Sequence, residues 1–464
     1  MKAEAVEVEA VVRKVLGEIL GRESADGGGS GIFSDMDKAV EAAWLAQKQL
    51  VRFNLEARGR FIEAIRSAVR KNAELLARMA VDETGMGRYE DKIKKNLLAA
   101  NKTPGIEDLT SEAFSGDDGL TLVELSPFGV IGAITPTTNP SETIICNSIG
   151  MIAAGNTVVF SPHPTAKDTS IRTVEILNKA ITESGGPCNL VTTVKEPTME
   201  QVGIMMKHRK INMLAATGGP AVVRAVLSSG KKAIGAGAGN PPVVVDDTAD
   251  IEKAAKDIID GCSFDNNLPC IAEKEVIVMD NVADYLIFCM KKHGAYELKD
   301  AARIKKLQKL VIDAQGHPNK AYIGKNADYI LSQLSINCLP CTRAIIMEVE
   351  REHPFVTEEL MMPILPIVRV KDIDEAIGLA VEVEHGFRHT AMMHSRNVEH
   401  LTRLAKEIQT TIFVKNGPSY SGIGVGGEGY TTFTIAGPTG EGLTSAKNFA
   451  RRRRCTLVGG FSIK

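Results

Sequence analysis

The stretch MLAATGGPAVVRAVL, residues 213–227, decides the fold class of the chain. Its first half is an apolar run of the kind that forms a buried strand, and its second half, from Pro220 onward, has the apolar spacing of a helix. Gly218 and Gly219 form the turn between the two. A strand, a glycine turn and a helix in this order indicate α/β layers around a mostly parallel sheet.

The same turn has the features of a phosphate-binding site. The N–H groups at the start of the helix and the helix dipole favour an anion, and the missing side chains at Gly218 and Gly219 allow a pyrophosphate to approach the backbone. Proline has no backbone N–H, but Pro220 stands in the first helical turn, where an N–H would have no acceptor within the helix. However, the turn does not match the G-x-G-x-x-G pattern, and a turn that serves only close packing has the same composition. Both interpretations of Thr217, Gly218 and Gly219 stay open on this pattern alone.

The pattern of the chain changes along its length. Residues 36–100 carry apolar side chains at helical spacing and are expected to form two or more helices. From about residue 120, apolar strands alternate with turns and helices, which again indicates α/β layers. With 464 residues, of which 44% are hydrophobic, the chain is long enough for two or three domains. The strand candidates are residues 130–134, 157–160, 189–194, 242–245, 275–278 and 364–370.

Composition limits the classes of partner. The formal net charge of −2 argues against a nucleic-acid partner that depends on whole-chain charge, and it favours small ligands. No apolar stretch is long enough to cross a bilayer, so we expect no membrane partner. The eight cysteines are scattered and no secretory signal precedes them, which indicates reduced thiols in a cytosolic compartment.

Two clusters invite a metal hypothesis, but both are weak. The CxxC at residues 338–341 is a single pair without nearby histidines. His385, His389 and His394 lie close together in the sequence, but Gly386 makes a shared helical face doubtful. We therefore expect no metal site, and we expect these histidines to have a structural use.

The first twenty residues form a separate unit. Their apolar side chains recur at the spacing of one helical face, and the opposite face carries charges of both signs, which argues against a membrane-surface helix. Residues 21–35 follow as a glycine-rich flexible linker. A tethered amphipathic helix is expected to bind in a groove, either on its own domain or on a partner. The apolar positions are Val8, Val11, Val12, Val15, Leu16, Ile19 and Leu20.

Cys270 is the cysteine whose surroundings are most typical of a nucleophile. It lies in NNLPCIAEK, residues 266–274, among small, amide and apolar side chains. A nucleophilic thiol needs an accessible sulfur, help in becoming a thiolate, and donors for the charge that forms on its target. The alternative is a buried structural cysteine. A separate run of alternating glycines, residues 235–239, is not followed by a helix, which favours a backbone wall beside a ligand.

Taken in order, the motifs of the chain resemble those of the aldehyde dehydrogenase superfamily. The similarity covers residues 36–464, and within the superfamily it is greatest to the CoA-acylating propionaldehyde and acetaldehyde dehydrogenases of bacterial microcompartments. The N-terminal segment with its linker also resembles the encapsulation peptides of enzymes in those compartments. The superfamily motifs are TPTTNP (135–140), GNTVV (155–159), TGG (217–219), LPC (268–270), EELMMP (358–363) and NGP (416–418), and the closer likeness rests on NNLPC (266–270), MMPILP (361–366) and GGEG (426–429).

The resemblance implies an aldehyde dehydrogenase-like α/β fold with two Rossmann-like domains and a β oligomerisation arm. The terminal strand of such an arm pairs across a subunit interface, so the resemblance implies a homo-oligomer, either a dimer or a tetramer. The run of four arginines at residues 451–454 would then lead into this strand. The implied divisions are residues 1–20 for the encapsulation helix, 21–35 for the linker, 36–112 and 127–238 for the NAD-binding domain, 239–430 for the catalytic domain, and 113–126 and 431–464 for the arm.

The resemblance also implies roles at matching positions. Cys270 would attack the aldehyde carbon, and Asn139 together with the backbone N–H of Cys270 would stabilise the oxyanion that forms. Glu359 would hold the nicotinamide ribose. The alternatives are a turn asparagine at Asn139 and a solvated charge at Glu359, and a minor hypothesis places His389 or Thr390 in the aldehyde pocket. The implied cofactor-binding residues are Thr135, Pro136, Thr137, Ser161, Thr217, Gly218, Gly219 and Glu359.

Two departures from the hydrolytic members bear on the reaction. Those enzymes carry a glutamate before a double glycine, where this chain has Ile234 followed by residues 235–240. Because the carboxylate that would activate water is absent, and a thiol needs less help than water, transfer of the acyl group to CoA is favoured. The second departure is Ser161, which stands where many members have a lysine that holds the adenosine ribose. NAD is therefore expected on family analogy alone.

The implied reaction converts a short-chain aldehyde, propionaldehyde or acetaldehyde, with NAD⁺ and CoA into acyl-CoA and NADH. It should be ping-pong, because the thioacyl enzyme must form before CoA attacks. The chain would act in the bacterial cytoplasm, inside a microcompartment whose shell protein binds residues 1–20. The alternatives are a hydrolytic aldehyde dehydrogenase and a catalytically silent adaptor protein in the lumen of the compartment.

Overall fold

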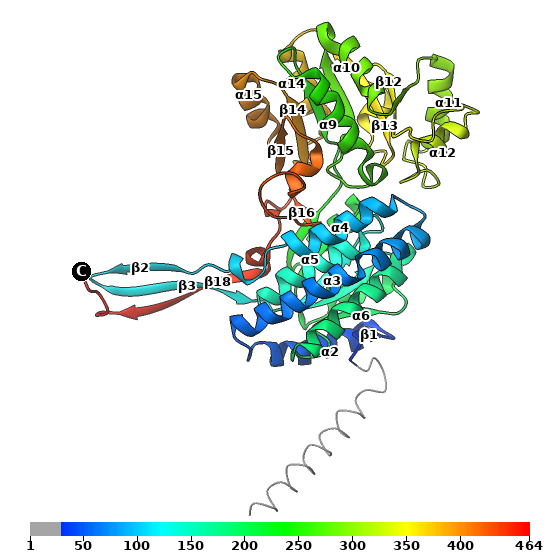
Figure 1. Ribbon diagram of the computed structural model, residues 1–464. Coiled ribbons are helices and arrows are strands. Elements are labelled where there is room, and N and C mark those ends of the chain that lie inside the picture. The colour runs from blue at the N-terminus through cyan, green and yellow to red at the C-terminus, as the bar shows by residue number, and fades with distance from the viewer. Residues whose placement is uncertain (1–28) are drawn as a thin grey trace, which may run out of the picture.

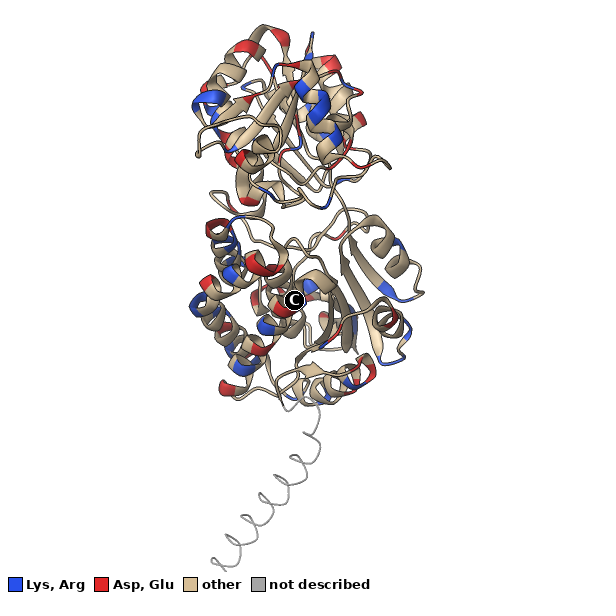
Figure 2. Ribbon diagram, turned by 90° about the vertical axis from the view of Figure 1, so that its right-hand side faces the viewer, with Lys and Arg blue, Asp and Glu red and all other residues tan. Residues whose placement is uncertain are grey.

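The computed structural model describes residues 29–464, so the predicted helix at residues 1–20 and most of the linker lie outside the described residues. Figure 1 shows two layered α/β bodies, one above the other, and a narrow ribbon of strands that projects sideways from the lower body. Figure 2 shows that the charged residues lie mainly on the outer helices, whereas the strands of both sheets are largely uncharged. Among residues 29–464, no helix is both long enough and apolar enough to span a membrane.

The lower body is built on a sheet whose strands follow the order β1-β6-β5-β4-β7-β8, with every neighbouring pair parallel. From β4 the chain moves outward through β5 and β6, and it then crosses to the other side of β4 to form β7 and β8. The sheet therefore has its topological switch point between β4 and β7, where the carboxyl ends of the strands leave a crevice for a ligand. The strands are β1 (Ile32–Phe33), β4 (Val130–Thr135), β5 (Thr157–Pro162), β6 (Val191–Val194), β7 (Ile211–Thr217) and β8 (Lys232–Ala236).

Helices cover both faces of this sheet. Asp35 and Asn54 start the first two of them by accepting hydrogen bonds from the backbone N–H groups of Lys38 and Ala57, and Gly85 ends the second in a left-handed conformation. The helices are α2 (Met36–Leu50), α3 (Leu55–Thr84), α4 (Tyr89–Lys102), α5 (Pro140–Ala153), α6 (Lys167–Glu183), α7 (Met199–Lys207) and α8 (Pro220–Leu227).

The upper body contains a second parallel sheet, in the order β11-β12-β13-β10-β9-β14-β15. Only residues 237–241 separate the end of β8 from the start of β9, so the chain passes directly from the carboxyl edge of one sheet to the amino edge of the other. The strands are β9 (Pro242–Val245), β10 (Glu275–Met279), β11 (Ala295–Glu297), β12 (Ala344–Glu348), β13 (Ile364–Val370), β14 (Thr390–His394) and β15 (Ile412–Lys415), and the helices are α9 (Ile251–Ser263), α10 (Asp280–Lys292), α11 (Ala301–Val311), α12 (Ala327–Ser332), α13 (Pro354–Thr357), α14 (Ile373–Val383) and α15 (Val398–Ile408).

The predicted α/β class with parallel sheets is confirmed, and each of the predicted strand segments contains a strand. The strand predicted at residues 189–194 begins only at Val191. Asn189 has a φ of 61°, a left-handed conformation that a regular strand does not contain.

The projecting ribbon is an antiparallel sheet of β2 (Glu112–Gly116), β3 (Gly119–Pro127) and β18 (Ala450–Val458). The four arginines at residues 451–454 lie within β18 itself and are exposed, and Arg452 pairs with Glu112 of β2. The strand of the ribbon starts at residue 450, later than the expected arm boundary at 431. Residues 431–449 instead return to the lower body, because side chains such as Phe433 and Phe449 are buried there.

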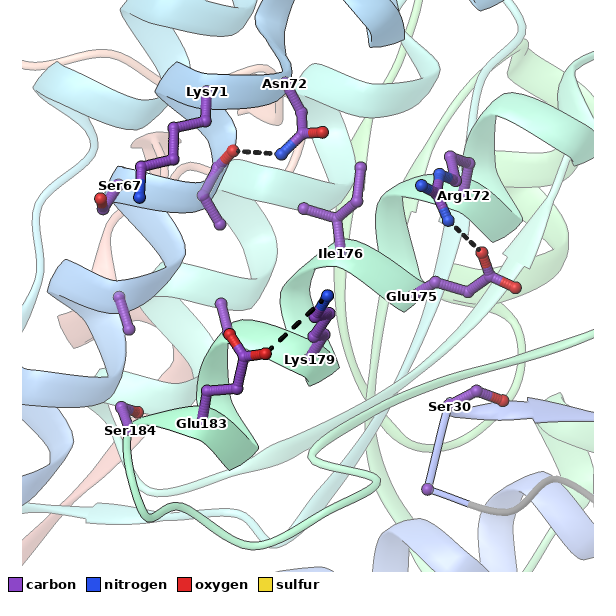
Figure 3. A pocket seen from close by; sticks show the side chains of 14 residues that line it. Ser30, Ser67, Lys71, Asn72, Arg172, Glu175, Ile176, Lys179, Glu183 and Ser184 are labelled. Carbon is purple, nitrogen blue, oxygen red and sulfur yellow. Dashed lines mark hydrogen bonds and ion pairs between the residues drawn. The ribbon is translucent and has the colours of Figure 1, made fainter.

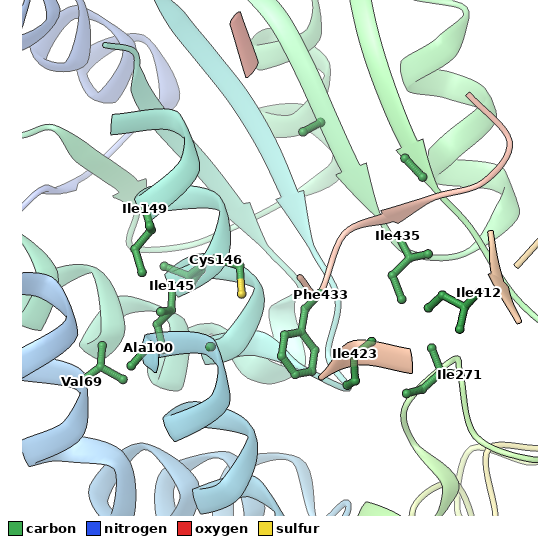
Figure 4. Packing of buried hydrophobic residues seen from close by; sticks show 14 of the residues in the cluster. Val69, Ala100, Ile145, Cys146, Ile149, Ile271, Ile412, Ile423, Phe433 and Ile435 are labelled. Carbon is green, nitrogen blue, oxygen red and sulfur yellow. The ribbon is translucent and has the colours of Figure 1, made fainter. Parts of the chain in front are cut away.

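One buried apolar cluster continues from the lower body to the loop that follows Cys270. Figure 4 shows Ile145, Cys146 and Ile149 of α5 on one side and Ile271, Ile412 and Ile423 on the other, with Phe433 and Ile435 between them. The loop that carries the candidate nucleophile is therefore packed against groups from both bodies.

Candidate active site

The sequence-predicted nucleotide residues lie at the switch point of the lower sheet. Thr135 ends β4, Ser161 is near the end of the neighbouring β5, and Thr217 ends β7. The hydroxyl oxygens of Thr135 and Ser161 are buried and have no hydrogen-bond partner within residues 29–464. Buried polar groups are normally satisfied, so these two hydroxyls fit a bound polar ligand at this edge. Thr137, two residues after β4, shares a hydrogen bond of 2.9 Å with Thr165.

The glycine turn between β7 and α8 borders open space. A Cβ added at Gly218 or Gly219 would have no atom of the described chain within 4 Å. Close packing therefore does not account for these glycines, whereas the approach of a ligand to the backbone does. The Gly218 N–H donates to the carbonyl of Ala236 at 3.1 Å, and α8 begins at Pro220 as predicted. The turn, the helix start and the unpartnered hydroxyls fit the pyrophosphate and ribose of a dinucleotide.

Cys270 follows a loop with an unusual backbone. Asp265, Asn266 and Asn267 all have positive φ, between 48° and 65°. The two asparagine side chains fix this conformation, because Asn266 Nδ2 donates to the carbonyl of Gly324 at 2.8 Å and Asn267 Nδ2 donates to that of Glu273 at 2.9 Å. The two amides in the motif before Cys270 are therefore structural supports of the nucleophile loop.

The electrostatic surroundings of Cys270 disfavour a thiolate in this state. Burial, and after it the carboxylate of Glu359, raise the pKa of Cys270 to about 12, while the nearby ammonium of Lys274 opposes the shift. Lys274 is itself buried, donates to Asn267 Oδ1 at 2.6 Å and lies 3.9 Å from Glu359 Oε1. We did not predict a role for Lys274, although it stands four residues after the nucleophile in the same motif.

Asn139 immediately precedes α5 and is buried. Its Oδ1 accepts a hydrogen bond of 2.6 Å from Lys95 Nζ, and its Nδ2 donates to Thr138 Oγ1 at 3.2 Å. Lys95 also forms an ion pair of 2.5 Å with Asp265 of the nucleophile loop. The ammonium group of Lys95 thus connects Asn139 to the loop of Cys270. Sequence reasoning missed this role of Lys95.

The alternating glycines lie beside Cys270. A Cβ at Gly239 would be 2.9 Å from both the carbonyl oxygen of Cys270 and Cγ of His389, and the backbone amide of Gly239 favours the charged form of the Glu359 carboxylate. Ile234, which precedes the alternating glycines, is fully buried in β8. The wall next to the nucleophile is therefore bare backbone and carries no carboxylate of its own.

His389 is the histidine of the cluster that reaches this wall. Its Nδ1 shares a hydrogen bond of 2.8 Å with Thr390 Oγ1, and its buried Nε2 has no partner in the described chain. Burial, with a smaller effect of Lys274, lowers the pKa of His389 to about 4, so the ring is neutral at pH 7. His394 lies inside β14, and across residues 29–464 no group of three or more His, Cys, Asp or Glu side chains is arranged to hold a metal ion.

Comparison with known proteins gives consistent matches. The model of the aldehyde dehydrogenase family matches residues 32–437. A propanal dehydrogenase (CoA-propanoylating) of Citrobacter freundii is 51% identical over 459 residues, which is 99% of each chain. The crystal structure of a Rhodopseudomonas palustris propionaldehyde dehydrogenase with bound CoA and an acylated cysteine is 63% identical, has a TM-score of 0.93, and matches over 94% of this chain and 100% of that one. A propionaldehyde dehydrogenase from the fucose utilisation microcompartment of Clostridium phytofermentans is 55% identical, with a TM-score of 0.92 and the same two coverages.

We predict that alkylation of Cys270 in the enzyme without cofactor accelerates with pH well beyond pH 9. Because its pKa is raised to about 12, its thiolate fraction should grow about tenfold per pH unit up to about pH 10. The alkylation rate of free cysteine, which has a pKa of about 8.5, levels off near pH 9 and serves as the reference. Peptide mass spectrometry after brief exposure to iodoacetamide separates Cys270 from the exposed Cys188, Cys341 and Cys455. A rate at Cys270 that levels off with the reference would contradict the prediction.

Proposed function

We propose that this chain, which belongs to the aldehyde dehydrogenase family, oxidises a short-chain aldehyde with NAD⁺ and transfers the acyl group from Cys270 to CoA. One observation carries the choice of acceptor: the wall beside Cys270 is the run of small residues 235–239, and neither this run nor Ile234 before it supplies a carboxylate that could activate water. The relative solved with bound CoA and an acylated cysteine supports the same chemistry. The chain is an NAD-dependent, CoA-acylating aldehyde dehydrogenase.

The first step is attack by the Cys270 sulfur on the aldehyde carbon. Before the first turnover the thiol loses its proton to solvent water, and the nearby ammonium of Lys274 favours the thiolate electrostatically. The aldehyde oxygen becomes an alkoxide as the C–S bond forms, and the N–H groups of Asn139 Nδ2 and of the Cys270 backbone are the proposed donors to it. The product of this step is a thiohemiacetal on Cys270.

The second step removes hydride and leaves a thioacyl group on Cys270. When bound, NAD⁺ supplies the hydride acceptor. The carboxylate of Glu359 is the proposed ligand of the nicotinamide ribose hydroxyls, and the backbone amide of Gly239 favours its charged form. Gly218 and Gly219 leave room for the pyrophosphate, and the remaining proposed contacts toward the adenosine are Thr135, Pro136, Thr137, Ser161 and Thr217.

The third step transfers the acyl group to CoA. Glu359 lies 3.9 Å from the ammonium of Lys274, which favours its charged form but competes with water for its oxygens. The neutral ring of His389 and the carbonyl of Cys270 both border Gly239, and His389 Nε2 has no partner within the described part of the molecule. We propose that His389 accepts the proton of the CoA thiol. The sulfur of CoA attacks the thioacyl carbon, His389 Nε2 takes the proton, and Cys270 leaves as the thiolate. CoA reacts only after the first product has formed, so the kinetics are ping-pong.

Incubation with propionaldehyde and NAD⁺ without CoA should add one propionyl group to Cys270, and added CoA should remove it as propionyl-CoA. Intact-protein and peptide mass spectrometry measure both events, and Cys270→Ala should show neither adduct nor turnover. Multiple turnovers at the full rate without CoA would instead favour a hydrolytic enzyme. Undiminished aldehyde oxidation by Cys270→Ala would favour a silent adaptor.

His389→Gln should form the thioacyl adduct at close to the normal rate and transfer it to CoA about 100-fold more slowly, because a proton acceptor of this kind contributes about 10² to 10⁴ in rate. In the unmodified enzyme, single-turnover transfer should stay constant from about pH 8 to about pH 5, because His389 is protonated only near its lowered pKa of about 4. His385→Gln, on the exposed side of the cluster, is the control. A transfer rate that falls tenfold per pH unit below pH 8 would show that the free CoA thiolate attacks without this base.

The ribbon of β2, β3 and β18 is the proposed oligomerisation arm of a dimer or tetramer. It projects from the lower body, and its outer strands present exposed apolar side chains: Phe114, Leu457 and Val458 are 57%, 51% and 85% exposed. Unpaired strand edges with apolar side chains are normally covered. A second copy of the chain, adding its own strand, would cover them.

Residues 1–20 are proposed to bind a microcompartment shell protein. A groove of about 750 Å³ between α3 and α6 is lined in part by Gly29, the first described residue. Figure 3 shows that charged side chains border it, with ion pairs of Arg172 with Glu175 and of Lys179 with Glu183. An apolar helix face fits poorly among such pairs, which favours a partner surface over this groove.

Deletion of residues 2–20 should leave turnover with free enzyme unchanged and abolish co-purification with intact compartments. Compartments from cells that produce either version would be isolated and assayed for the enzyme by immunoblot. A control with Arg172→Ala and Lys179→Ala opens the groove without altering the N-terminal segment and should be encapsulated normally. Retention of the truncated enzyme in the compartments would contradict the proposal.

A further inference from the structure

Lys95 is a fully buried lysine on α4 whose ammonium group has three acceptors. Its Nζ lies 2.5 Å from Asp265 Oδ2, 2.6 Å from Asn139 Oδ1 and 3.2 Å from Glu142 Oε1. The contact with Asn139 is a hydrogen bond and the contacts with Asp265 and Glu142 are ion pairs, so three oxygen atoms surround the ammonium. Burial disfavours the charge, but Asp265 and Glu142 outweigh it and raise the pKa of Lys95 above its ordinary value, so the group is cationic.

The contact with Asn139 determines which way its amide points. Because an ammonium only donates, the oxygen of the amide must face Lys95, and Nδ2, which gives one N–H to Thr138 Oγ1, keeps a second N–H to donate. An asparagine just before a helix ordinarily accepts a hydrogen bond from the backbone of the first turn. Within the described chain, the Asn139 side chain makes no such bond to α5, because its oxygen is taken by Lys95.

The contact with Asp265 holds the loop that leads to Cys270. The same carboxylate accepts the backbone N–H of Arg88 at 2.7 Å and pairs with Lys92 at 3.2 Å. A Cβ at Gly87 would lie only 2.2 Å from Asp265 Oδ1, so the start of α4 encloses this carboxylate closely. The left-handed backbone of Asp265 is thus maintained from α4, on the opposite body.

We propose that Lys95 is a positioning residue for the first chemical step: one ammonium aims the Asn139 amide at the alkoxide and fixes the Cys270 loop in register with it. The inference rests on the proposed function, since it assigns Lys95 a role through Asn139 and Cys270. Neither the proposed oxyanion donor nor the nucleophile needs to move when the thiohemiacetal forms, because both are already set by the same cation.

The competing explanation is that Lys95 only stabilises the fold. Replacing a whole buried ion pair by apolar side chains of similar volume is often tolerated, whereas removing one partner is strongly destabilising, so a loss of rate in Lys95→Met could reflect the fold alone. A double-mutant cycle separates the two explanations, because a residue that acts through Asn139 loses its effect once the Asn139 amide is gone.

The cycle compares the unmodified enzyme, Lys95→Met, Asn139→Ala and the double variant, with the single-turnover rate of NADH formation as the readout. Removal of one oxyanion donor lowers a rate by about 10² to 10³. Lys95→Met should lower the rate about 100-fold in the unmodified enzyme and less than about threefold in Asn139→Ala, while NAD⁺ affinity measured by titration stays within about threefold. Lys94→Met, exposed on the same helix and 63% accessible at its side chain, is the matched control and should react normally.

Lys95→Gln keeps a donor for Asn139 without the charge, so it should recover part of the rate; it also provides a folded variant if Lys95→Met is unstable by thermal unfolding. Independent, multiplying effects of Lys95→Met and Asn139→Ala would overturn the inference, as would a Lys95→Met rate within about threefold of normal. If the unmodified enzyme forms no CoA-dependent acyl product, the proposed function itself fails, and that result is distinct from either outcome of the cycle.

Discussion

The carboxyl edge of one parallel sheet faces the amino edge of another, and every feature of the candidate site follows from this constraint. The switch point between β4 and β7 supplies the open crevice and the unpartnered hydroxyls. The loops before β10 and β14 supply Cys270 and His389. Because residues 237–241 join the two edges directly, the glycine wall is also the connection between the bodies, and the reacting atoms meet where the chain crosses.

Buried cations hold the two edges in register. Lys95 reaches from α4 to the nucleophile loop, and Lys274 lies between Asn267 and Glu359. Taking such charges out of water is costly, and loss of one partner from a buried pair destabilises a protein by about 3 to 5 kcal/mol. In a region of low dielectric, the same charges act strongly on a thiolate or an alkoxide. The two lysines therefore affect both the stability of the contact between the two bodies and the electrostatics of the reaction.

The fold class and the strands were predictable from the sequence because each has a local signal. Apolar runs bounded by turns identified the strands, and ordered motifs indicate Cys270, Asn139 and Glu359 as candidate site residues, which stay a prediction. Lys95 has no such signal. On α4 the buried face carries Lys92, Lys95 and Asn96 at the spacing where apolar residues would be expected, so the helix has the pattern of a solvated element. Its partners are far away in the sequence, and only the folded chain brings them together. Residues 431–449, which the resemblance assigned to the arm, depend on distant contacts as well, since Phe449 is buried beside Gly150 of α5.

The absence of a carboxylate from residues 234–240 has a consequence for the direction of the reaction. Hydrolysis of the thioacyl group would release its free energy and make the oxidation irreversible. Exchange of one thioester for another keeps the acyl group activated, with little change in free energy at that step. The same enzyme is therefore able to run backwards and reduce an acyl-CoA to an aldehyde with NADH, and the relative amounts of the two nucleotides around it set which way carbon flows.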